Sequence, residues 1–448
     1  MGGAHATCDP EGILKNADVD YVVLGEGEVR LPLLLREIEK GRTAGIKRME
    51  GIGYREDGEI RVNFVQGFVR DLDALPYPAR DLLDLDQYRI RKRRATMLIT
   101  SRGCPHQCAY CSARFVMGDS FRARSPEAIV QEMMECRERY GVQIFDIEDD
   151  NFTYDQRRAK QLLNLIIASF GEGRLELSAM NGVSFASMDE ELIELMKRAG
   201  FQTLNLSFVS GDMFTKERMK RPKAAIAFDR ILEGADTLGL DVVAYGIFGM
   251  PGQTVEEMVD TLIYLMGKRV LIGPSIYYPT PRTPLFEMCR MEGLIPPHLS
   301  RWRSSAFPIE TKEFDRIDLV TLFRLVRVIN FIKGKIDQRE LDEGMTWREI
   351  YQEVKVEAKV KAEVKNKDVA EIGTQAPHNK DIATTWKGMV FLVLSERSFF
   401  SLRKGPTGGL GALKEKSSKR VVDYFLEKAW DKPILKSRHG SFETLHSA

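Results

Sequence analysis

The sequence of 448 residues predicts an α/β fold, in which a partial (β/α)6 TIM-like barrel is followed by an α-rich C-terminal extension. Apolar strand patterns alternate with helical patterns six times, which is typical of a parallel sheet with right-handed crossovers. Six units are fewer than the eight of a complete barrel. A shorter α/β pattern precedes the barrel, and the periodicity weakens after Pro296. We therefore expect three parts, residues 1–80, 90–295 and 296–448.

The barrel strands are expected at residues 97–100, 144–147, 175–179, 203–208, 242–248 and 274–278. Helices are expected between them, at residues 126–140, 157–170, 187–199, 227–238 and 255–266. Ser125 and Pro126 form a strong start signal for the first helix. Ser187 and Glu190 have capping-box spacing and are expected to open the third. In such folds the chemistry lies at the carboxyl ends of the strands.

The segment before the barrel has its own short elements. A strand at residues 21–24, the turn Gly25-Glu26-Gly27-Glu28 and a helix at 29–39 are followed by a hairpin around Asp57-Gly58. Pro76 and Pro78 mark a linker, and the basic stretch 89–94 is expected to be a solvated loop. At the other end, residues 346–365 predict a charged helix, 405–411 are glycine-rich, and we expect this extension to be partly disordered.

Composition limits the class of protein. Lys and Arg total 66 against 65 Asp and Glu, so a net charge of +1 gives no general attraction to nucleic acid or anionic lipid. The longest apolar runs are far shorter than the ~20 residues that span a bilayer, and no secretory signal is visible at the N-terminus. Six cysteines in so long a chain are no disulfide scaffold. We expect a cytoplasmic protein with no membrane span and no clear nucleic-acid partner.

The loop "SRGCPHQCAYCS" holds three of the six cysteines, Cys104, Cys108 and Cys111, with C-x3-C-x2-C spacing. Structural zinc prefers four ligands in two separated pairs, and the remaining cysteines are scattered. His106 could supply a fourth ligand only by straining the loop. Soft thiolates also suit iron–sulfur clusters, and a cubane held by three cysteines leaves one iron open to a ligand. A zinc or other structural site is the alternative. The scattered cysteines, which we expect to be ordinary thiols, are Cys8, Cys136 and Cys289.

This loop and several later blocks together resemble the radical S-adenosylmethionine (SAM) superfamily. The resemblance covers roughly residues 2–287 and includes "FRARSPE", "FDIEDDNF", "YGIFGMPGQT" and "YPTPRTPLFE". It implies a [4Fe–4S] cluster on Cys104, Cys108 and Cys111, with SAM chelating the fourth iron. Reductive cleavage of SAM would then yield a 5′-deoxyadenosyl radical.

The same resemblance implies the residues that surround SAM. Those assigned to the adenine are Tyr110, Gly249 and Gly252, and those near the amino group are Glu148, Asp149 and Asp150. Relatives often carry an acid where this chain has Val209, and glutamate where it has Gln253, so Ser207 or Ser210 is expected to substitute. Arg122 and Arg124 either clamp a carboxylate or pair with nearby acids, and Asn181 either faces the lumen or is a loop amide.

The front of the chain resembles the later half of a cobalamin-binding domain, which implies a Rossmann-like half-domain remnant before the barrel. The D-x-H-x-x-G motif of such domains is absent. Either Met1 is not the true start, or the domain has degenerated, or a partner supplies the rest. Gly2, Gly3 and the Gly25–Gly27 turn are the candidates for corrin contact, and whether cobalamin binds stays open.

The resemblance implies a radical SAM enzyme of the cobalamin-associated branch. Hydrogen abstraction from an unactivated carbon is expected, with methyl transfer or rearrangement as outcomes, on a small-molecule or otherwise unidentified substrate. Ferredoxin or flavodoxin is the expected type of electron donor. The alternatives are a methylthiotransferase-like radical SAM enzyme and a non-catalytic iron–sulfur or zinc module. No residue can be assigned as catalytic from the sequence.

Overall fold

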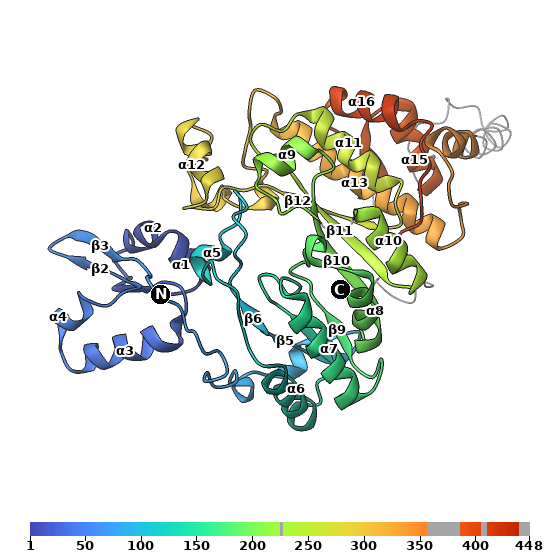
Figure 1. Ribbon diagram of the computed structural model, residues 1–448. Coiled ribbons are helices and arrows are strands. Elements are labelled where there is room, and N and C mark those ends of the chain that lie inside the picture. The colour runs from blue at the N-terminus through green and yellow to red at the C-terminus, as the bar shows by residue number, and fades with distance from the viewer. Residues whose placement is uncertain (225–226, 356–385, 405–409, 439–448) are drawn as a thin grey trace. The chain divides into compact units, whose positions relative to one another are not determined.

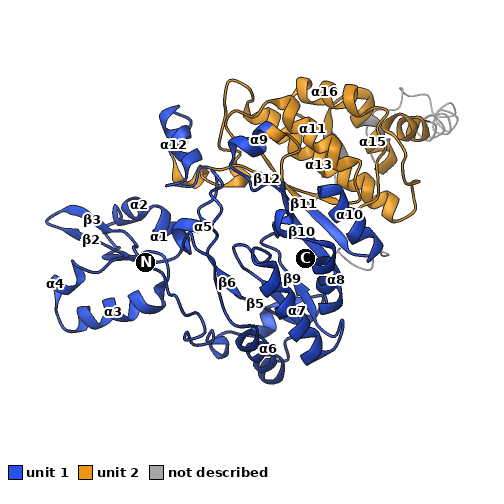
Figure 2. Ribbon diagram, viewed as in Figure 1, with its two compact units in different colours: residues 1–208, 214–243, 279–297 blue, residues 209–213, 244–278, 298–448 orange. Residues whose placement is uncertain are grey.

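The computed structural model describes residues 1–224, 227–355, 386–404 and 410–438 (Figure 1). The chain divides into two compact units, which we treat separately (Figure 2). Unit 1 comprises Met1–Phe208, Phe214–Val243 and Pro279–Pro297, and unit 2 comprises Val209–Met213, Ala244–Tyr278 and His298–Ala448.

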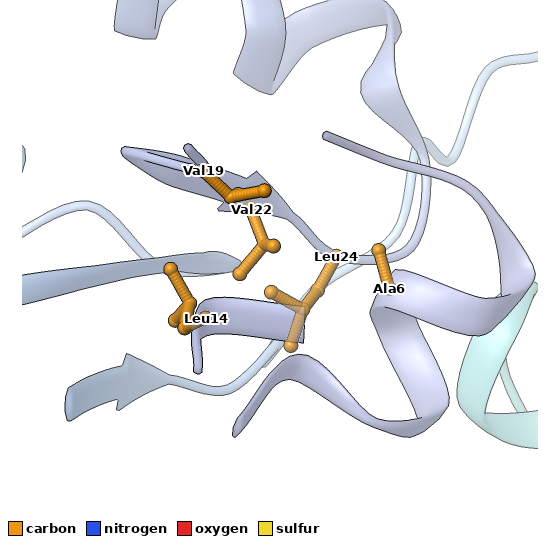
Figure 3. Close-up of a cluster of buried hydrophobic side chains, with 5 residues drawn as sticks. All are labelled: Ala6, Leu14, Val19, Val22 and Leu24. Carbon is orange, nitrogen blue, oxygen red and sulfur yellow. The ribbon is translucent and has the colours of Figure 1, made fainter. Parts of the chain in front are cut away.

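Unit 1 begins with a small layer of helices and strands. The sheet of this layer is antiparallel in the order β1-β2-β3, and among its described residues the one parallel pairing is the bridge from Gly2 to Val23. Asp57 and Gly58 have φ angles of 51° and 83°, so the expected hairpin is confirmed, with a primed turn. Leu14, Val22 and Leu24 belong to its core (Figure 3). The elements are α1 (Ala4–Cys8), α2 (Pro10–Leu14), β1 (Tyr21–Val23), α3 (Gly27–Glu39), α4 (Thr43–Ile46), β2 (Ile52–Glu56) and β3 (Glu59–Asn63).

The barrel begins with a sheet in the order β4-β5-β8-β9. The pairs β5–β8 and β8–β9 are parallel, as the alternating pattern predicts, with Ala95 opposite Ile144 and Ile144 opposite Glu176. Parallel bridges from Leu177 to Phe201 and from Val183 to Leu206 connect this sheet to β10. The strands are β4 (Arg89–Ile90), β5 (Arg93–Leu98), β8 (Ile144–Ile147), β9 (Glu176–Ser178) and β10 (Thr203–Val209).

The helices of unit 1 follow local capping signals. Ser125 accepts from the backbone N–H of Ala128 and caps α6, as predicted. The predicted start of α8 is wrong: Asp189 is the N-cap, because its carboxylate accepts from Leu192 N, while Ser187 ends a short 3-10 turn. The helices are α5 (Ala113–Val116), α6 (Pro126–Tyr140), α7 (Gln156–Phe170), α8 (Glu190–Ala199), α9 (Met213–Arg218, whose first residue falls in unit 2), α10 (Phe228–Thr237) and α12 (Pro284–Met291).

The basic stretch 89–94 is a hairpin rather than the expected loop. Arg91 and Lys92 have positive φ angles and form the turn between β4 and β5. The guanidinium groups of Arg91 and Arg93 both pair with Glu176 on β9. Glu176 thus partly neutralises the charge of the basic stretch within the sheet. This pairing weakens the argument that the stretch binds nucleic acid.

Unit 2 contains the end of the barrel and the C-terminal extension. Strand β11 begins in unit 1 and continues beside β12 in unit 2, where α11 and α13 follow capping boxes at Thr254 and Asp315. The extension is α-rich as predicted, but it also contains an antiparallel pair, β13 and β14. The elements are β11 (Asp241–Phe248), α11 (Val255–Met266), β12 (Leu271–Ile276), α13 (Arg316–Asp337), α15 (Trp386–Glu396), β13 (Phe399–Lys404), β14 (Leu410–Glu415) and α16 (Lys419–Ala429).

Of the charged helix expected at residues 346–365, positions 347–355 are helical and the rest lie outside the described residues. Most of the glycine-rich stretch 405–411 lies outside them as well. Among the helices that the structure describes, none combines the length and apolar character needed to cross a bilayer.

Candidate functional site

The cysteine loop leaves the barrel after β5 and is fixed at both ends. Short strands β6 (Ser101–Arg102) and β7 (Arg122–Ala123) pair across its base. Gly103 has a φ of 81°, and a Cβ there would lie 2.3 Å from the carbonyl oxygen of Ser120, so only glycine fits. Within the loop, Cys104 N donates to Gly118 O at 3.2 Å and Cys111 N to Cys108 O at 3.1 Å.

The three predicted ligands are free thiols within one loop. Burial raises the pKa of Cys111 to about 11, and the neighbouring thiols of Cys108 and Cys104 contribute to the rise. Burial also raises the pKa of Cys104. Two donors reach the sulfurs, since Asn151 Nδ2 lies 3.8 Å from Cys104 Sγ and Arg221 Nη1 lies 3.8 Å from Cys108 Sγ. Such donors stabilise negative charge on sulfur, which is the form that binds metal.

The donor set fits an iron–sulfur cluster. In the described part of the chain, no three His, Cys, Asp or Glu side chains are grouped as a single metal ion requires. A cubane does not need such a group, because each thiolate binds a different iron. Two buried polar atoms near the loop, Asn151 Oδ1 and His106 Nε2, have no hydrogen-bond partner among the described residues. His106 packs edge-on against Tyr154 at 5.6 Å, and burial lowers its pKa.

Arg221 is a site residue that the sequence analysis missed. It follows α9, far along the chain from the cysteine loop, and belongs to none of the recognised motifs. Besides Cys108, its guanidinium donates to Tyr110 Oη at 3.2 Å, to Ser207 O at 3.0 Å and to Ser207 Oγ at 3.1 Å. One cation therefore connects two predicted SAM contacts, Tyr110 and Ser207, to a predicted cluster ligand. Burial raises the pKa of Tyr110, so its hydroxyl stays protonated.

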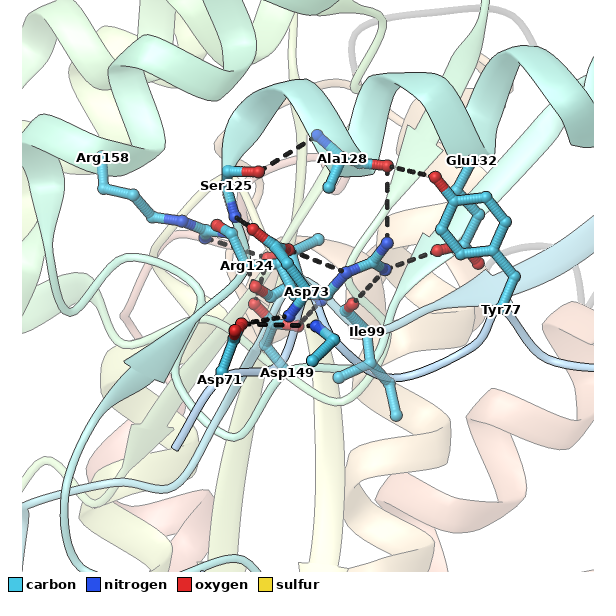
Figure 4. A network of polar contacts seen from close by, with 12 residues as sticks. Asp71, Asp73, Tyr77, Ile99, Arg124, Ser125, Ala128, Glu132, Asp149 and Arg158 are labelled. Atoms are coloured by element: carbon cyan, nitrogen blue, oxygen red, sulfur yellow. Dashed lines mark hydrogen bonds and ion pairs between the residues drawn. The ribbon is translucent and has the colours of Figure 1, made fainter. Parts of the chain in front are cut away.

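Asp149, a predicted SAM contact, is fully buried and its oxygens are occupied. They accept from Thr100 N at 2.6 Å, from Ser101 Oγ at 2.7 Å and from the Thr100 hydroxyl. Arg158 donates to Thr100 Oγ1 at 3.0 Å and so lies close to this carboxylate (Figure 4). Burial raises the pKa of Asp149. These contacts join the end of β5 to the end of β8, and a role toward SAM stays a prediction.

Glu148 and Asp150 flank that buried acid. Asp150 Oδ2 accepts from Gly103 N at 2.9 Å, directly before the first cysteine, and burial raises its pKa. The pKa of Glu148 rises to about 7, through burial first and then through a hydrogen bond with Asp146. Both carboxyl groups lie where the sequence predicted them, at the carboxyl end of β8, and their contact with SAM stays a prediction.

Arg122 and Arg124, for which the sequence left two interpretations open, both pair with acids. Arg122 Nη1 donates to Glu26 Oε1 at 2.9 Å. Arg124 donates to Glu132, and its Nε lies 3.8 Å from Asp73 Oδ1 (Figure 4). Asn181 Nδ2 lies 3.4 Å from the carbonyl oxygen of Asp149, as a loop amide would. The arginines are therefore occupied as structural ion pairs.

The Gly25–Gly27 turn is attached to the cysteine loop through its acid. The carboxylate of Glu26 is buried and accepts from Arg102 Nη1 and Arg122 Nη1, both at 2.9 Å, and from Val69 N at 2.7 Å. Arg102 directly precedes Gly103 and the first cysteine ligand. The front segment and the loop thus share one ion-pair network within unit 1, while corrin contact stays a prediction.

The remaining predicted residues lie in unit 2. Ser210 is buried, and its Oγ accepts from Asp212 N at 3.0 Å. Gly249 has a φ of 80°, and a Cβ there would meet Leu319 at 2.9 Å. Gln253 Oε1 accepts from Met250 N at 2.9 Å, so this amide holds its own loop. Val209 has a φ of 71°, an unfavourable angle for a β-branched residue.

Comparisons with known proteins show which superfamily the chain resembles. The model of the radical SAM superfamily matches residues 98–265. An uncharacterized methyltransferase of Pyrococcus horikoshii is 26% identical over 348 residues, 77% of this chain and 74% of the relative. The cytidylyl-2-hydroxyethylphosphonate methyltransferase of Streptomyces wedmorensis is 28% identical over 342 residues, 68% of this chain and 63% of that enzyme.

A solved structure has a similar fold. It is OxsB, a cobalamin-dependent SAM radical enzyme with aqua-cobalamin and SAM bound. The TM-score is 0.56 at 14% identity, over 88% of this chain and 58% of OxsB. At this identity the likeness concerns the fold. The chain spans less than two thirds of the Streptomyces enzyme and of OxsB.

Proposed function

We propose that the protein is a cobalamin-linked radical SAM methyltransferase, since residues 98–265 match the model of the radical SAM superfamily. A [4Fe–4S] cluster and SAM are the cofactors of this family. When bound, they supply reductive cleavage of SAM to a 5′-deoxyadenosyl radical. The observation that carries the proposal is the group of three free thiols in one loop, with Asn151 and Arg221 as donors 3.8 Å from two of the sulfurs.

We assign the cluster to Cys104, Cys108 and Cys111. The side chains around them have separate roles. Arg221 would neutralise charge that accumulates on the thiolates, and its second nitrogen would hold Ser207 in place. Asn151 would keep Cys104 oriented through the amide contact with its sulfur.

The three acids at the end of β8 would have two roles. Glu148 and Asp150 would bind SAM, and Asp149 would stabilise the structure around them. Glu148 and Asp150 have raised pKa values and incomplete hydrogen bonding, so a cationic ammonium group beside them would favour their ionised forms. Asp149 would stabilise the strand end that carries them, since its oxygens already accept hydrogen bonds from Thr100 and Ser101. Gly249 would allow backbone to approach the adenine closely.

The cobalamin part of the proposal is supported by OxsB and by the front segment. OxsB carries aqua-cobalamin, and its likeness covers 88% of this chain. The network of Glu26, Arg102 and Arg122 would keep the front segment attached to the cysteine loop. We propose a low-potential electron donor such as ferredoxin or flavodoxin, a small-molecule substrate, and a reducing cytoplasm in which six free cysteines persist.

Replacement of the ligands tests the function. Cys104→Ser, Cys108→Ser and Cys111→Ser are expected to lose about four irons per chain after anaerobic reconstitution, and to lose formation of 5′-deoxyadenosine from SAM. Cys136→Ala is the matched control, because Cys136 is a buried thiol on α6 and should leave both readouts unchanged. Full iron content and SAM cleavage in the Cys108→Ser protein would contradict the proposal. Transfer of sulfur together with the methyl group would favour the methylthiotransferase alternative.

A further inference from the structure

A cavity of about 690 Å³ lies within unit 2, at the carboxyl end of β12. This volume falls in the range of about 300–1,000 Å³ that small-molecule sites occupy. None of its lining residues is among those assigned above to the cluster or to SAM. Its lining residues are Pro274, Ile276, Tyr278, Trp302, Arg303, Ser304, Ser305, Phe307 and Phe323.

The walls of the cavity are aromatic. Four of the lining side chains are Tyr278, Trp302, Phe307 and Phe323, which come from three different segments of unit 2. Phe307 and Phe323 meet edge to face, with ring centroids 5.9 Å apart and an interplanar angle of 89°. Aromatic walls of this kind favour a flat π system, which gains from offset stacking and edge contacts beyond simple burial.

One cation lies at this aromatic cavity. Arg303 lines it with an exposed side chain, and among the residues that the structure describes its guanidinium has no ion pair and no hydrogen bond. Arg122 and Arg124 beside the cysteine loop are, by contrast, paired with acids. An unpaired guanidinium with a planar fork of donors suits a carboxylate or another oxyanion.

The segment that carries Arg303 is held in place by a hydrogen bond to the hydroxyl group of Ser304. Ser304 Oγ accepts from Ile276 N at 3.1 Å, which attaches the segment to the end of β12. Phe307 has a φ of 49°, a conformation that costs a bulky residue on the order of 1 kcal/mol. Non-glycine residues in this region are retained where surrounding structure requires them, often at ligand sites. Phe307 is the C-cap of the short 3-10 turn Ser304–Ala306, and its ring lines the cavity.

We infer that this cavity binds an aromatic anion, a flat ring system that carries a carboxylate or a similar oxyanion, with the ring between the aromatic walls and the anion on Arg303. The inference rests on the proposed function in one respect only, namely that this ligand is the substrate class of the radical SAM enzyme. Binding itself does not depend on the cluster.

A binding titration with 2-naphthoate tests this inference, with 2-naphthamide as the neutral analogue. Saturable binding of naphthoate to the full chain is expected. Arg303→Gln should weaken naphthoate binding about tenfold, since a charge-assisted contact is lost, and should leave naphthamide unchanged. Trp302→Leu should weaken both ligands. Arg301→Gln is the control, because Arg301 is an exposed arginine two positions earlier that does not line the cavity.

Naphthoate binding that is absent, or equally tight in Arg303→Gln and the unaltered chain, would overturn the inference. Iron content and SAM cleavage, measured on the same proteins, separate the two proposals. A cluster that forms and cleaves SAM without naphthoate binding would refute only the cavity. Naphthoate binding without a cluster would refute the radical SAM function and leave the cavity as a binding site.

Discussion

Arg221 places one guanidinium nitrogen 3.8 Å from the sulfur of Cys108. The same nitrogen donates to the hydroxyl of Tyr110, and the second nitrogen donates to Ser207. Residues from two distant parts of the barrel thereby share one partly buried cation. Since a guanidinium stays charged, it provides a permanent positive field beside a candidate cluster ligand.

Removal of that cation should change the reduction potential of the cluster. We expect Arg221→Gln to lower the potential by on the order of 50 mV, because reduction adds negative charge that the guanidinium stabilises. An EPR-monitored redox titration measures the shift. Arg218→Gln is the control, since this exposed arginine contacts only Thr215 among the partners recorded for it. Equal potentials in the Arg221 variant and the unaltered protein would show that the contact has no electrostatic role.

The positive φ angle of Val209 leads to a second prediction, which compares the stability of two variants at this position. With a φ of 71°, this position should favour glycine, so Val209→Gly should be more stable than Val209→Ala by about 1 kcal/mol. At Val242, which is equally buried and has no positive φ, alanine should be the more stable by about 0.5–1 kcal/mol. Chemical denaturation of the four variants gives both differences. If alanine is more stable than glycine at both positions, the backbone at Val209 is unstrained.

Replacement of Asp149 should lower the stability of the folded protein. An Asp149→Asn amide would point donors at the Thr100 and Ser101 hydroxyls, so we expect a loss of about 3 kcal/mol in the free energy of unfolding. Asp155→Asn serves as the matched control, because it caps α7 and asparagine caps a helix equally well. Denaturant unfolding compares the two proteins. Stability close to that of the unaltered chain would contradict a structural role for Asp149.

Glu148 should make stability depend on pH. Its folded-state pKa of about 7 lies above the ordinary value of 4.5, so protonation favours the folded protein. This contribution is complete below pH 4.5 and is lost as the pH rises through 7. The free energy of unfolding should therefore fall between pH 5 and 8, and the fall should be smaller in Glu148→Gln. Glu172→Gln, at an exposed position, should keep the full slope.

Local signals explain why much of the barrel could be predicted from sequence. The start of α6 depends on Ser125 and Pro126, and the β2–β3 hairpin depends on Asp57 and Gly58, all of which act within a few residues. The predicted elements were wrong where a sequence signal was ambiguous or where charged residues lie in a strand. Strand β5 begins at Arg93 rather than at Met97, because paired arginines resemble a solvated loop in sequence.

Long-range contacts could not be predicted in this way. The cysteine ligands are neighbours in sequence, whereas Arg221 reaches Cys108 only because the barrel closes a separation of 113 residues. The occupied state of Asp149 likewise depends on Thr100, a residue of another strand end. Helix α13 was missed although its local signals are present, since Asp315 caps it and its buried apolar residues recur at helical spacing.

The EPR spectrum of the anaerobically reconstituted and reduced protein, recorded with and without SAM, tests the central claim most directly. A [4Fe–4S] cluster held by Cys104, Cys108 and Cys111 keeps one iron open, so its signal should shift when SAM is added. A protein without a cluster, or a cluster signal that is indifferent to SAM, would contradict the radical SAM function and leave a structural metal site.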